Sequence, residues 1–286
     1  MKNNLKKMSG ADHKQTLRPQ GDTVSAAQLA YEKALRSREK RIVFCRILLL
    51  VILVAAWEIG AQTGTLNAFI FSSPSRMVKT FLEMAASGTL FIHIGVTLGE
   101  TLLSFLITMV IGITVAVLLW CSKTLSDILE PYLVMLNSLP KSALAPVLIV
   151  WLGNNIRTIV VAAVSVAVFG CIMTLYTGFR EIDEDKLKLI RTLGGGKREI
   201  IMKVLIPGSV PLIVSSMKVN IGLCLVGVII GEFLAANYGL GYLIIYGSQV
   251  FKLDLVMMSI VILCVISAGL YLGVNVLEKK FGKDRK

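Results

Sequence analysis

Apolar runs long enough to cross a lipid bilayer recur along the chain, and they restrict its fold more than any other feature. A membrane-spanning helix needs about 20 apolar residues. Inside the bilayer each segment must satisfy its own backbone hydrogen bonds, which makes such runs helical. Only 17% of the residues are charged, against about 25% in soluble domains. The sequence therefore predicts an all-α integral membrane protein. Six spans are expected, at Ile42–Ala61, Thr97–Trp120, Ile128–Leu152, Ile156–Gly178, Val210–Ala236 and Asp254–Leu277.

The 30 lysine and arginine residues are distributed unevenly between the loops. Most of them lie in the segments that share a side with the N-terminus, and basic loops remain in the cytoplasm. We therefore expect both termini in the cytoplasm and the chain in a plasma membrane of the bacterial inner-membrane type. The net charge of +12 then reflects topology rather than nucleic-acid binding. The predicted organisation is a basic cytoplasmic tail over residues 1–41 and a transmembrane domain over residues 42–286.

Two segments outside the predicted spans show apolar residues at helical spacing. Residues 74–87 open with a proline suited to a helix start, and they predict an amphipathic helix at the outer surface. Residues 24–40 predict a basic helix in the tail. That helix either lies on the anionic inner leaflet or is solvated and without function.

Metal, cofactor and nucleotide motifs receive no support from the sequence. The five cysteines lie in or beside apolar runs without metal-like or disulfide-like spacing, and the two histidines are isolated. The run from Gly194 to Lys197 is no phosphate loop, because Arg198 stands where that motif needs Ser or Thr. We expect that this chain binds no metal or cofactor and holds no catalytic residue.

The loop over residues 179–208 is far longer than a connector between two helices requires. Its residues 183–193 begin with three acidic side chains that suit the start of a helix and end before Gly194, a helix breaker. A second short helix is expected over residues 197–205, ended by Pro207. Both helices are partly apolar. The residues alone leave open whether they dock a soluble partner or lie against the membrane interface.

This loop resembles the signature of ABC importer permeases: Glu-Ala-Ala, three residues, Gly, nine residues, then Ile, any residue and Leu-Pro. Gly194 and Pro207 stand at its Gly and Pro, and residues 191–194, Arg-Thr-Leu-Gly, match the version found in nitrate, sulfonate and taurine permeases. Lys-Leu-Ile replaces Glu-Ala-Ala at residues 188–190, so a salt bridge of that Glu is not carried over; Glu184, one turn earlier, could pair with Lys188. The resemblance implies that the loop is a coupling helix that docks on an ATPase. The candidate coupling residues are Leu187, Ile190, Arg191, Thr192, Leu193, Gly194, Lys197 and Pro207.

Further matches to the same family extend from about residue 70 to residue 281, and their order and spacing make them specific. Residues 73–75 resemble the family's segment before the amphipathic helix, residues 140–153 its broken third span, and residues 218–244 its fifth span and outer loop. The tail of residues 1–41 is longer than usual for the family.

The resemblance implies a transport subunit rather than an enzyme. It implies a permease domain over residues 42–286 that forms a homodimer, two copies of a separate ATPase that binds ATP and magnesium, and an extracytoplasmic substrate-binding protein. The resembling permeases carry nitrate, sulfonates, taurine, bicarbonate or vitamin-related heterocycles, so we expect a small anionic or heterocyclic solute. Pairing with a different permease stays open.

Prolines and polar residues within the predicted spans are candidates for the translocation pathway. Two prolines in the third span should break its helix, and broken helices in transporters tend to line cavities. Glu232, among apolar residues, is either a gate near the outer mouth or an interface residue that reaches water. The polar residues of the fifth span either line the path or only join helices. The candidates are Pro140, Pro146, Ser215, Ser216, Asn220 and Glu232.

Three other charged residues in or near the spans are expected at less central positions. Glu58 and Glu100 should sit at the membrane interfaces, leaving Glu232 as the main intramembrane acid. Lys218 should reach toward the inner interface or pair across a dimer.

Two other classes of membrane protein would leave different signatures in the sequence. A secondary transporter would favour inverted repeats, paired intramembrane carboxylates and more spans. A membrane-embedded enzyme would need clustered His, Asp or Glu side chains at a membrane face. The sequence favours neither class over the importer subunit.

Overall fold

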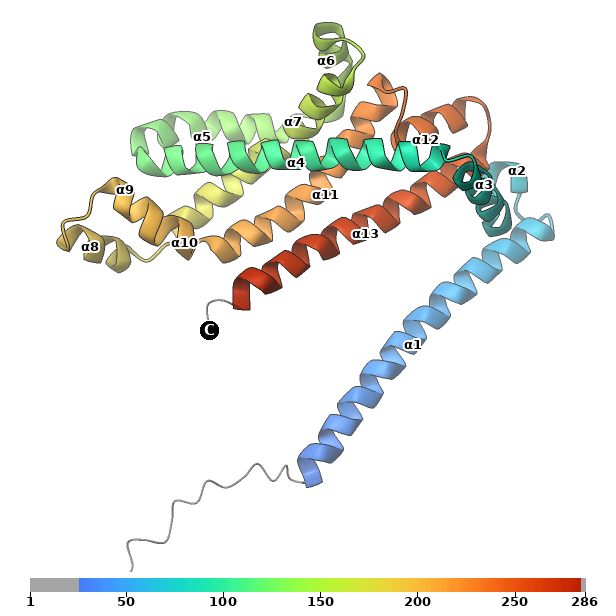
Figure 1. Ribbon diagram of the computed structural model, residues 1–286, viewed down its shortest axis with the longest axis horizontal. Helices are drawn as coiled ribbons and strands as arrows, with labels where there is room; N and C mark the ends of the chain where they lie inside the picture. Colours follow the sequence, from blue (N-terminus) through green and yellow to red (C-terminus); the bar gives the residue numbers. More distant parts are fainter. Residues whose placement is uncertain (1–25, 284–286) are drawn as a thin grey trace, which may run out of the picture. The chain divides into compact units, whose positions relative to one another are not determined.

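The computed structural model describes residues 26–283, and every regular element within that range is a helix (Figure 1). The chain divides into two units, Met1–Trp57 and Glu58–Lys286. Residues 1–25, with the start of the basic helix predicted in the tail, lie outside the described residues. The elements are α1 (Ala26–Gln62), α2 (Ala68–Phe71), α3 (Pro74–Ala86), α4 (Thr89–Cys121), α5 (Lys123–Ser138), the 3₁₀ turn η1 (Lys141–Leu144), α6 (Ala145–Leu152), α7 (Ile156–Arg180), α8 (Glu184–Thr192), α9 (Lys197–Ile200), the π-helical turn η2 (Ile201–Leu205), α10 (Ile206–Gly208), α11 (Val210–Ala235), α12 (Leu240–Gln249) and α13 (Leu253–Lys283).

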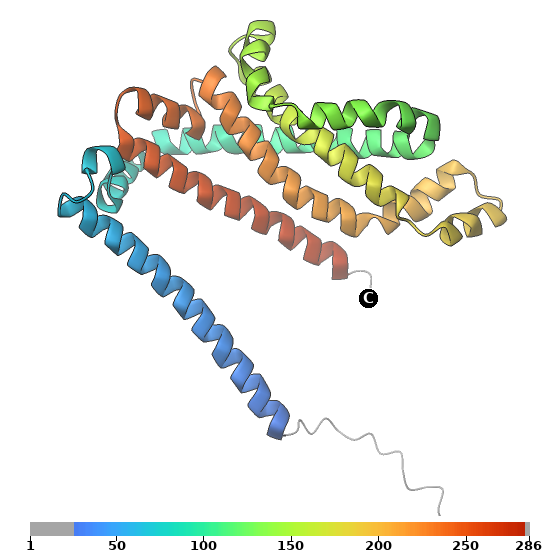
Figure 2. The ribbon, with the colours of Figure 1, turned by 180° about the vertical axis from the view of Figure 1, so that it is seen from behind.

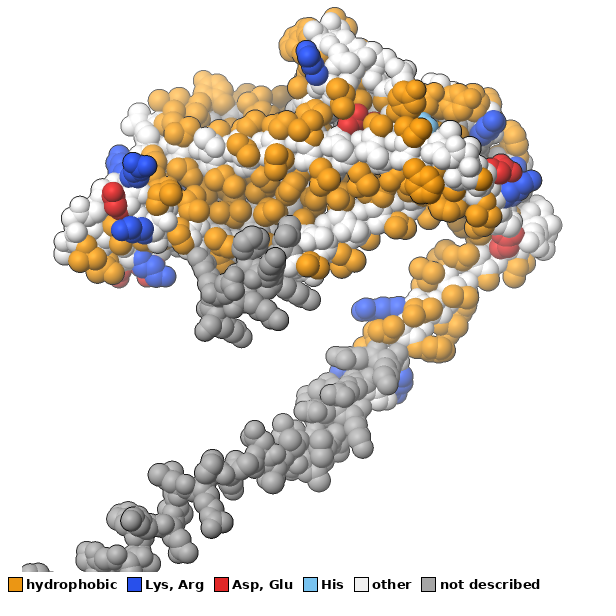
Figure 3. Space-filling view, in the orientation of Figure 1, with side chains coloured by type: hydrophobic (Ala, Val, Ile, Leu, Met, Phe, Trp, Pro, Cys, Tyr) orange, Lys and Arg blue, Asp and Glu red, His pale blue; other side chains and the backbone are white. Residues whose placement is uncertain are grey.

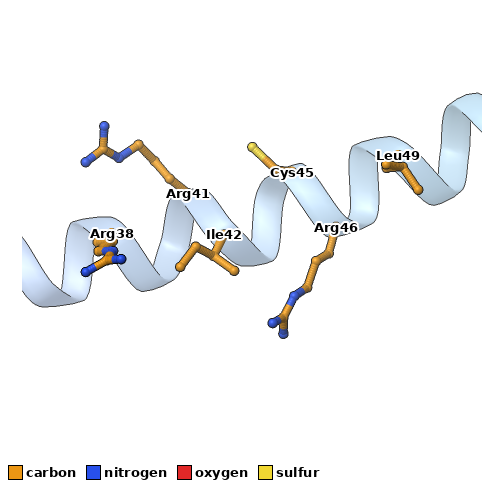
Figure 4. A pocket seen from close by; sticks show the side chains of 6 residues that line it. All are labelled: Arg38, Arg41, Ile42, Cys45, Arg46 and Leu49. Atoms are coloured by element: carbon orange, nitrogen blue, oxygen red, sulfur yellow. The ribbon is translucent and has the colours of Figure 1, made fainter.

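The first unit holds most of α1. None of the residues in the most apolar stretch of this helix is buried. Arg38, Arg41 and Arg46 flank the start of that stretch, and Figure 4 shows Arg41 and Arg46 pointing to opposite sides of the helix. Long basic side chains at the end of a span can extend toward the polar headgroups. The apolar side chains of a membrane-spanning helix face lipid or other protein.

Five helices of the described residues are long and apolar enough to cross a membrane. They correspond to the first, second, fourth, fifth and sixth predicted spans, which are therefore confirmed as helices; the fifth ends one residue earlier than predicted, at Ala235. The candidate spans are Arg41–Gln62, Thr89–Cys121, Ile156–Arg180, Val210–Ala235 and Leu253–Val276.

The third predicted span is not one continuous helix, as its prolines predicted. Helix α5 ends at Ser138, and Leu139 is extended, with ψ 139°, because a residue before proline is forced out of the helical region. After η1 the chain resumes as α6, with Pro146 in its first turn, where a missing N–H costs no helical hydrogen bond.

Helices α4, α7 and α11 form the core of the second unit. Helix α7 packs against both α4 and α11, and α13 runs beside α11 (Figures 1 and 2). Small residues allow the close approach: a Cβ on Gly227 of α11 would lie 2.6 Å from the Cα of Ala163 in α7. Membrane helices pack through such residues because lipid gives large apolar side chains no reason to turn inward.

The second unit buries small and polar side chains alongside its apolar core, and many of its large apolar side chains lie outside. On α4, Thr97, Ser104 and Thr108 are buried, whereas Leu103 and Leu106 are exposed. Hydrophobic side chains cover the sides of the long helices in Figure 3, while lysine and arginine side chains gather around α8 and α9 and near α3. This distribution suits a helix bundle surrounded by lipid.

The helices predicted at residues 74–87 and 197–205, outside the spans, are both present, and the second has a different end. A helix over residues 74–87 was predicted, and helix α3 spans Pro74–Ala86; it buries Met77. The helix that begins at Lys197 does not end before Pro207, as predicted, but continues to Gly208. The π-helical turn η2 ends two residues before Pro207. A π-turn is wider than an α-helical one, which leaves room for a proline ring that would otherwise clash with the carbonyl one turn earlier.

Candidate functional site

Helix α8 and the turn that follows it form the first candidate site. Asp183 caps the helix, accepting a 2.9 Å hydrogen bond from the amide of Asp185. Lys188 pairs with Glu184 at 3.7 Å, as the sequence suggested, and with Asp185 at 3.2 Å. Because all three side chains are exposed, these pairs contribute less than about 1 kcal/mol to stability. Both pairs lie within α8. Its apolar residues, rather than these charges, therefore distinguish the surface of the helix.

The coupling residues predicted on α8 are divided between two faces. Leu187 and Ile190 are half-buried and face the unit. Arg191, Thr192 and Leu193 are exposed, and 74% of Leu193 is accessible. Exposed Leu189 and Met202, which were not among the candidates, add to this apolar surface.

A cleft of about 380 Å³ lies between α8 and the ends of the long helices. Leu187 and Glu184 line it on one side. The other walls are built by Leu119, Trp120, Lys123, Ser126, Asp127, Tyr176, Phe179, Arg180 and Ile182. The start of α8 therefore lies over the junction of α4, α5 and α7.

The segment after α8 is anchored in the core. Gly194 has a φ of 81°, a left-handed conformation that suits glycine. The ammonium group of Lys197 lies 3.5 Å from the carbonyl oxygen of Cys121, at the end of α4. Ile200 is 2% exposed and Leu205 is fully buried. Pro207 is half-buried and leads into α11. The segment after α8 therefore contacts the end of α4 and continues into α11.

The predicted pathway residues do not form one site. Pro140, Pro146 and Ser215 are exposed on the second unit. Ser216 and Asn220 are buried, and the Asn220 amide donates to the carbonyl oxygen and hydroxyl of Ser216 at 2.8 and 2.9 Å. Ser215 and Ser216 are neighbours on α11, but the first is exposed and the second is buried.

Glu232 is fully buried, so the predicted interface position that reaches water is wrong. Its carboxyl oxygens accept hydrogen bonds from the Thr97 hydroxyl at 2.7 Å and from the Gly241 amide at 2.6 Å. The Tyr242 amide also donates to it. The group thus joins α4, α11 and the start of α12.

Glu100 is a buried acid that was not among the predicted site residues. It is 3% exposed, and its carboxyl group lies beside that of Glu232. A signal was available: His93, Thr97 and Glu100 recur at helical spacing within an apolar span, which places them on one face. We call Thr97, Glu100 and Glu232 the carboxyl cluster.

The turn before α12 closes over the carboxyl cluster. The Gly239 amide donates to Nδ1 of His93 at 3.0 Å, and the Leu240 amide donates to the Thr97 hydroxyl at 2.8 Å. The ring of Tyr242 stacks on His93, with 6.0 Å between ring centroids. Side chains of α4 therefore bind the backbone of this turn.

Lys218 forms a salt bridge with Glu278 of α13 inside the same chain, and its ammonium group lies 5.9 Å from the ring centroid of Tyr271. Neither expected position for Lys218 included this partner. Within the described residues, no three His, Cys, Asp or Glu side chains gather as metal ligands would.

Comparison with known proteins identifies the relatives of this chain. Residues 108–283 match the family described as binding-protein-dependent transport system inner membrane component. A putative aliphatic sulfonates transport permease protein of Bacillus subtilis is 28% identical over 84% of this chain and 87% of the relative. A formylaminopyrimidine transport permease protein of Halalkalibacterium halodurans is 27% identical over 68% of this chain and 77% of the relative.

A solved structure has the same fold. A chain from an inward-facing MetNI methionine ABC transporter superposes with a TM-score of 0.59 and 20% identity, covering 67% of this chain and 95% of that one. At this identity the likeness concerns the fold. The fold, the apolar helices and the matched family agree on a multi-pass inner-membrane protein.

Proposed function

We propose that this chain, which belongs to the family of inner membrane components of binding-protein-dependent transport systems, forms the translocation pathway for a small anionic or heterocyclic solute. The chain is a permease subunit of an ABC importer rather than an enzyme. The solute class rests on the sulfonate and formylaminopyrimidine permeases among its relatives. An external binding protein would deliver this solute to the outer face.

The proposed assembly contains two copies of this permease and two copies of a separate ATPase that binds ATP and magnesium. Each permease would cross the membrane six times, with the interrupted segment from α5 to α6 as the third crossing and both termini in the cytoplasm. The exposed prolines of that segment and Ser215 would then face the path between the two permeases. Broken helices that line a cavity are common in transporters.

The exposed apolar surface of α8 and the residues after it supports this proposal most directly. Leu189, Leu193 and Met202 are 59%, 74% and 67% exposed, in a loop rich in charged residues that no span contains. Apolar side chains exposed among charges mark a surface for a protein partner. The ATPase would bind there.

The contacts of the loop indicate how ATP binding would move the spans. When the two ATPases close, the α8 helices that they hold would approach each other. Ile200 and Leu205, buried in the core, would carry that movement into the bundle because a packed interior transmits displacement. Helix α11 would then shift against α4 and α7, and the pathway would open to the other side.

The paired carboxyl groups of Glu100 and Glu232 are a feature that a secondary transporter would also show. Here, however, Glu232 is fully buried and its oxygens are occupied by backbone amides and a hydroxyl. The family assignment favours the importer, and the two possibilities make opposite predictions for dependence on an ATPase.

The decisive experiment is a mild-detergent pull-down of the tagged chain from its native membrane. The wild-type chain should recover a nucleotide-binding ATPase, and Arg191→Asp with Leu193→Asp should lose at least nine-tenths of it, roughly the effect of 1.4 kcal/mol in binding. The matched control is Lys79→Asp, a charge reversal at an exposed residue of α3, which should leave recovery unchanged.

The remaining outcomes distinguish the alternatives. Recovery of the chain without any ATPase would contradict the importer and favour a secondary transporter. An ATPase that survives both substitutions would remove α8 from its assigned role. Coexpression with an untagged copy tests the homodimer, since the untagged copy should co-purify.

A further inference from the structure

The carboxyl cluster contains two acids that no step of the proposed transport cycle uses. Glu100 of α4 is 3% exposed and Glu232 of α11 is fully buried. Thr97, one turn before Glu100 on α4, donates to Glu232, which places the two carboxyl groups side by side. Two buried carboxylates side by side repel each other, so one member of the pair must be a neutral acid.

The partners of Glu232 decide which member is charged. Thr97 accepts a hydrogen bond from the Leu240 amide, so its own hydroxyl proton is available to Glu232 Oε1. The amides of Gly241 and Tyr242 can only donate. Every neighbour of Glu232 is therefore a donor, which suits a carboxylate.

The position of Glu232 at the start of α12 supports the same assignment. The first amides of a helix lack partners within the helix, and the helix dipole favours a negative charge there. In α12 the first three amides, those of Leu240, Gly241 and Tyr242, donate to Thr97 and Glu232. Glu232 therefore acts as a cap supplied by another helix.

Glu100 has the opposite surroundings. One of its carboxyl oxygens is buried without a hydrogen-bond partner, and no lysine or arginine of the described residues forms a salt bridge with either acid of the cluster. A buried charge without a partner is costly. A neutral acid that donates its proton to Glu232 avoids that cost.

We propose that Glu100 is a neutral acid that donates its proton to the carboxylate of Glu232, and that this one-proton pair is the latch that fixes α12 to α4 and α11. Both acids are positioning residues. The other titratable groups near this latch are His93 and Tyr242, and the ring of Tyr238 also packs against His93. The latch rests on the proposed function in one respect only: the six-span topology of that proposal places α12 on the outer side of the membrane.

The assignment gives the two acids different responses to the same substitution. Glu100→Gln keeps a hydrogen-bond donor toward Glu232, the amide NH₂ group, but removes the carboxyl proton. Glu232→Gln instead turns an amide NH₂ group toward neighbours that are themselves donors. The matched control is Glu83→Gln, at an exposed position of α3.

Infrared spectroscopy of the purified protein in lipid at neutral pH detects the proton. The wild type and Glu83→Gln should show the C=O stretch of a neutral carboxyl group, and Glu100→Gln should lose that band completely. Absence of the band from the wild type, or its persistence in Glu100→Gln, would overturn the proposal.

Amide hydrogen exchange measures the latch without requiring transport. The peptide covering residues 239–247 should exchange at least tenfold faster in Glu232→Gln and at the wild-type rate in Glu100→Gln and Glu83→Gln. Equal acceleration in both variants of the pair, or none in either, would show that Glu232 does not hold α12. If Glu232→Gln fails to fold, Glu232→Asp replaces it, because a shorter carboxylate keeps the charge but draws back from the amides.

These measurements are independent of the proposed importer. A chain that loses its ATPase on substitution of α8 but shows no neutral carboxyl group would keep its function and lose the latch. A chain that shows the neutral carboxyl group but recovers no ATPase would keep the latch and lose the function.

Discussion

Glu232 fills the space where a side chain on Gly241 would stand. A Cβ at position 241 would lie 2.8 Å from Oε2 of Glu232 and 3.1 Å from the backbone oxygen of Ile229. At Gly239 the φ of 116° is unfavourable for other residues, and a Cβ there would lie 2.3 Å from the Glu232 carboxyl carbon. The turn can approach the buried carboxyl group only because both positions lack side chains.

Gly241→Ala should therefore displace the start of α12 and lower the stability of the protein by about 1–3 kcal/mol, the usual cost of overpacking. Thermal unfolding in a fixed detergent measures the loss. Gly99→Ala is the control, since nothing lies within 4 Å of a Cβ at that position of α4. An equal effect of the two substitutions would mean that the cluster tolerates the added methyl group.

The contact between α7 and α11 predicts a second sensitive glycine. An added Cβ on Gly227 would meet backbone atoms of Ala163, which cannot rotate away as a side chain can. Gly227→Ala should push the two helices apart and lower stability by about 1–3 kcal/mol. Gly222→Ala, on the same helix with open space around its Cβ, should leave the unfolding temperature unchanged. An unchanged Gly227→Ala protein would contradict the observed packing.

The turn after α8 should tolerate asparagine better than alanine at position 194. Gly194 has open space around it but a φ of 81°. That conformation costs other residues roughly 1–2 kcal/mol, with asparagine less disfavoured. Under the proposed coupling role, Gly194→Ala should retain less ATPase in the pull-down than Gly194→Asn. The reverse order would show that backbone conformation at this turn does not set the docking geometry.

The salt bridge between Lys218 and Glu278 should be detectable in a double-mutant cycle. Their side chains are 19% and 41% exposed, so we expect a coupling free energy of about 1 kcal/mol, at the upper end for partly exposed pairs. Charge reversal at either residue should lower the unfolding temperature, and the exchanged pair should regain most of it. The exposed pair of Glu184 and Lys188 is the control, with a coupling of about 0.3–0.5 kcal/mol.

The proposed orientation predicts which cysteines can be labelled from outside the cell. Leu193 and Phe251 are 74% and 68% exposed and belong to loops on opposite sides in the six-span topology. With the native cysteines replaced, an impermeant thiol reagent on whole cells should modify Phe251→Cys but not Leu193→Cys. Inside-out vesicles should give the opposite pattern. The same result in both preparations would refute the orientation.

The broken third span and the capped helix α8 could be predicted because local rules govern them. A proline imposes an extended residue before it wherever it stands, as at Leu139. An acidic residue at a helix start caps the nearest amides, as Asp183 does. The continuation of the helix through Pro207 was missed, because a π-helical turn can absorb a proline without a signal in the sequence.

The sequence by itself determined that the chain is a bundle of membrane helices, and its loop motif indicated the family. Each span must satisfy its own backbone within the bilayer, so length and apolar composition suffice to predict it. Only the tertiary structure decided that Glu100 lies beside Glu232 and that Lys218 forms a salt bridge with Glu278. Contacts of this kind depend on the distance between two packed helices and on the rotation of each about its own axis. That geometry is set by small residues such as Gly227 against Ala163, whose fit becomes visible only when both helices are in place.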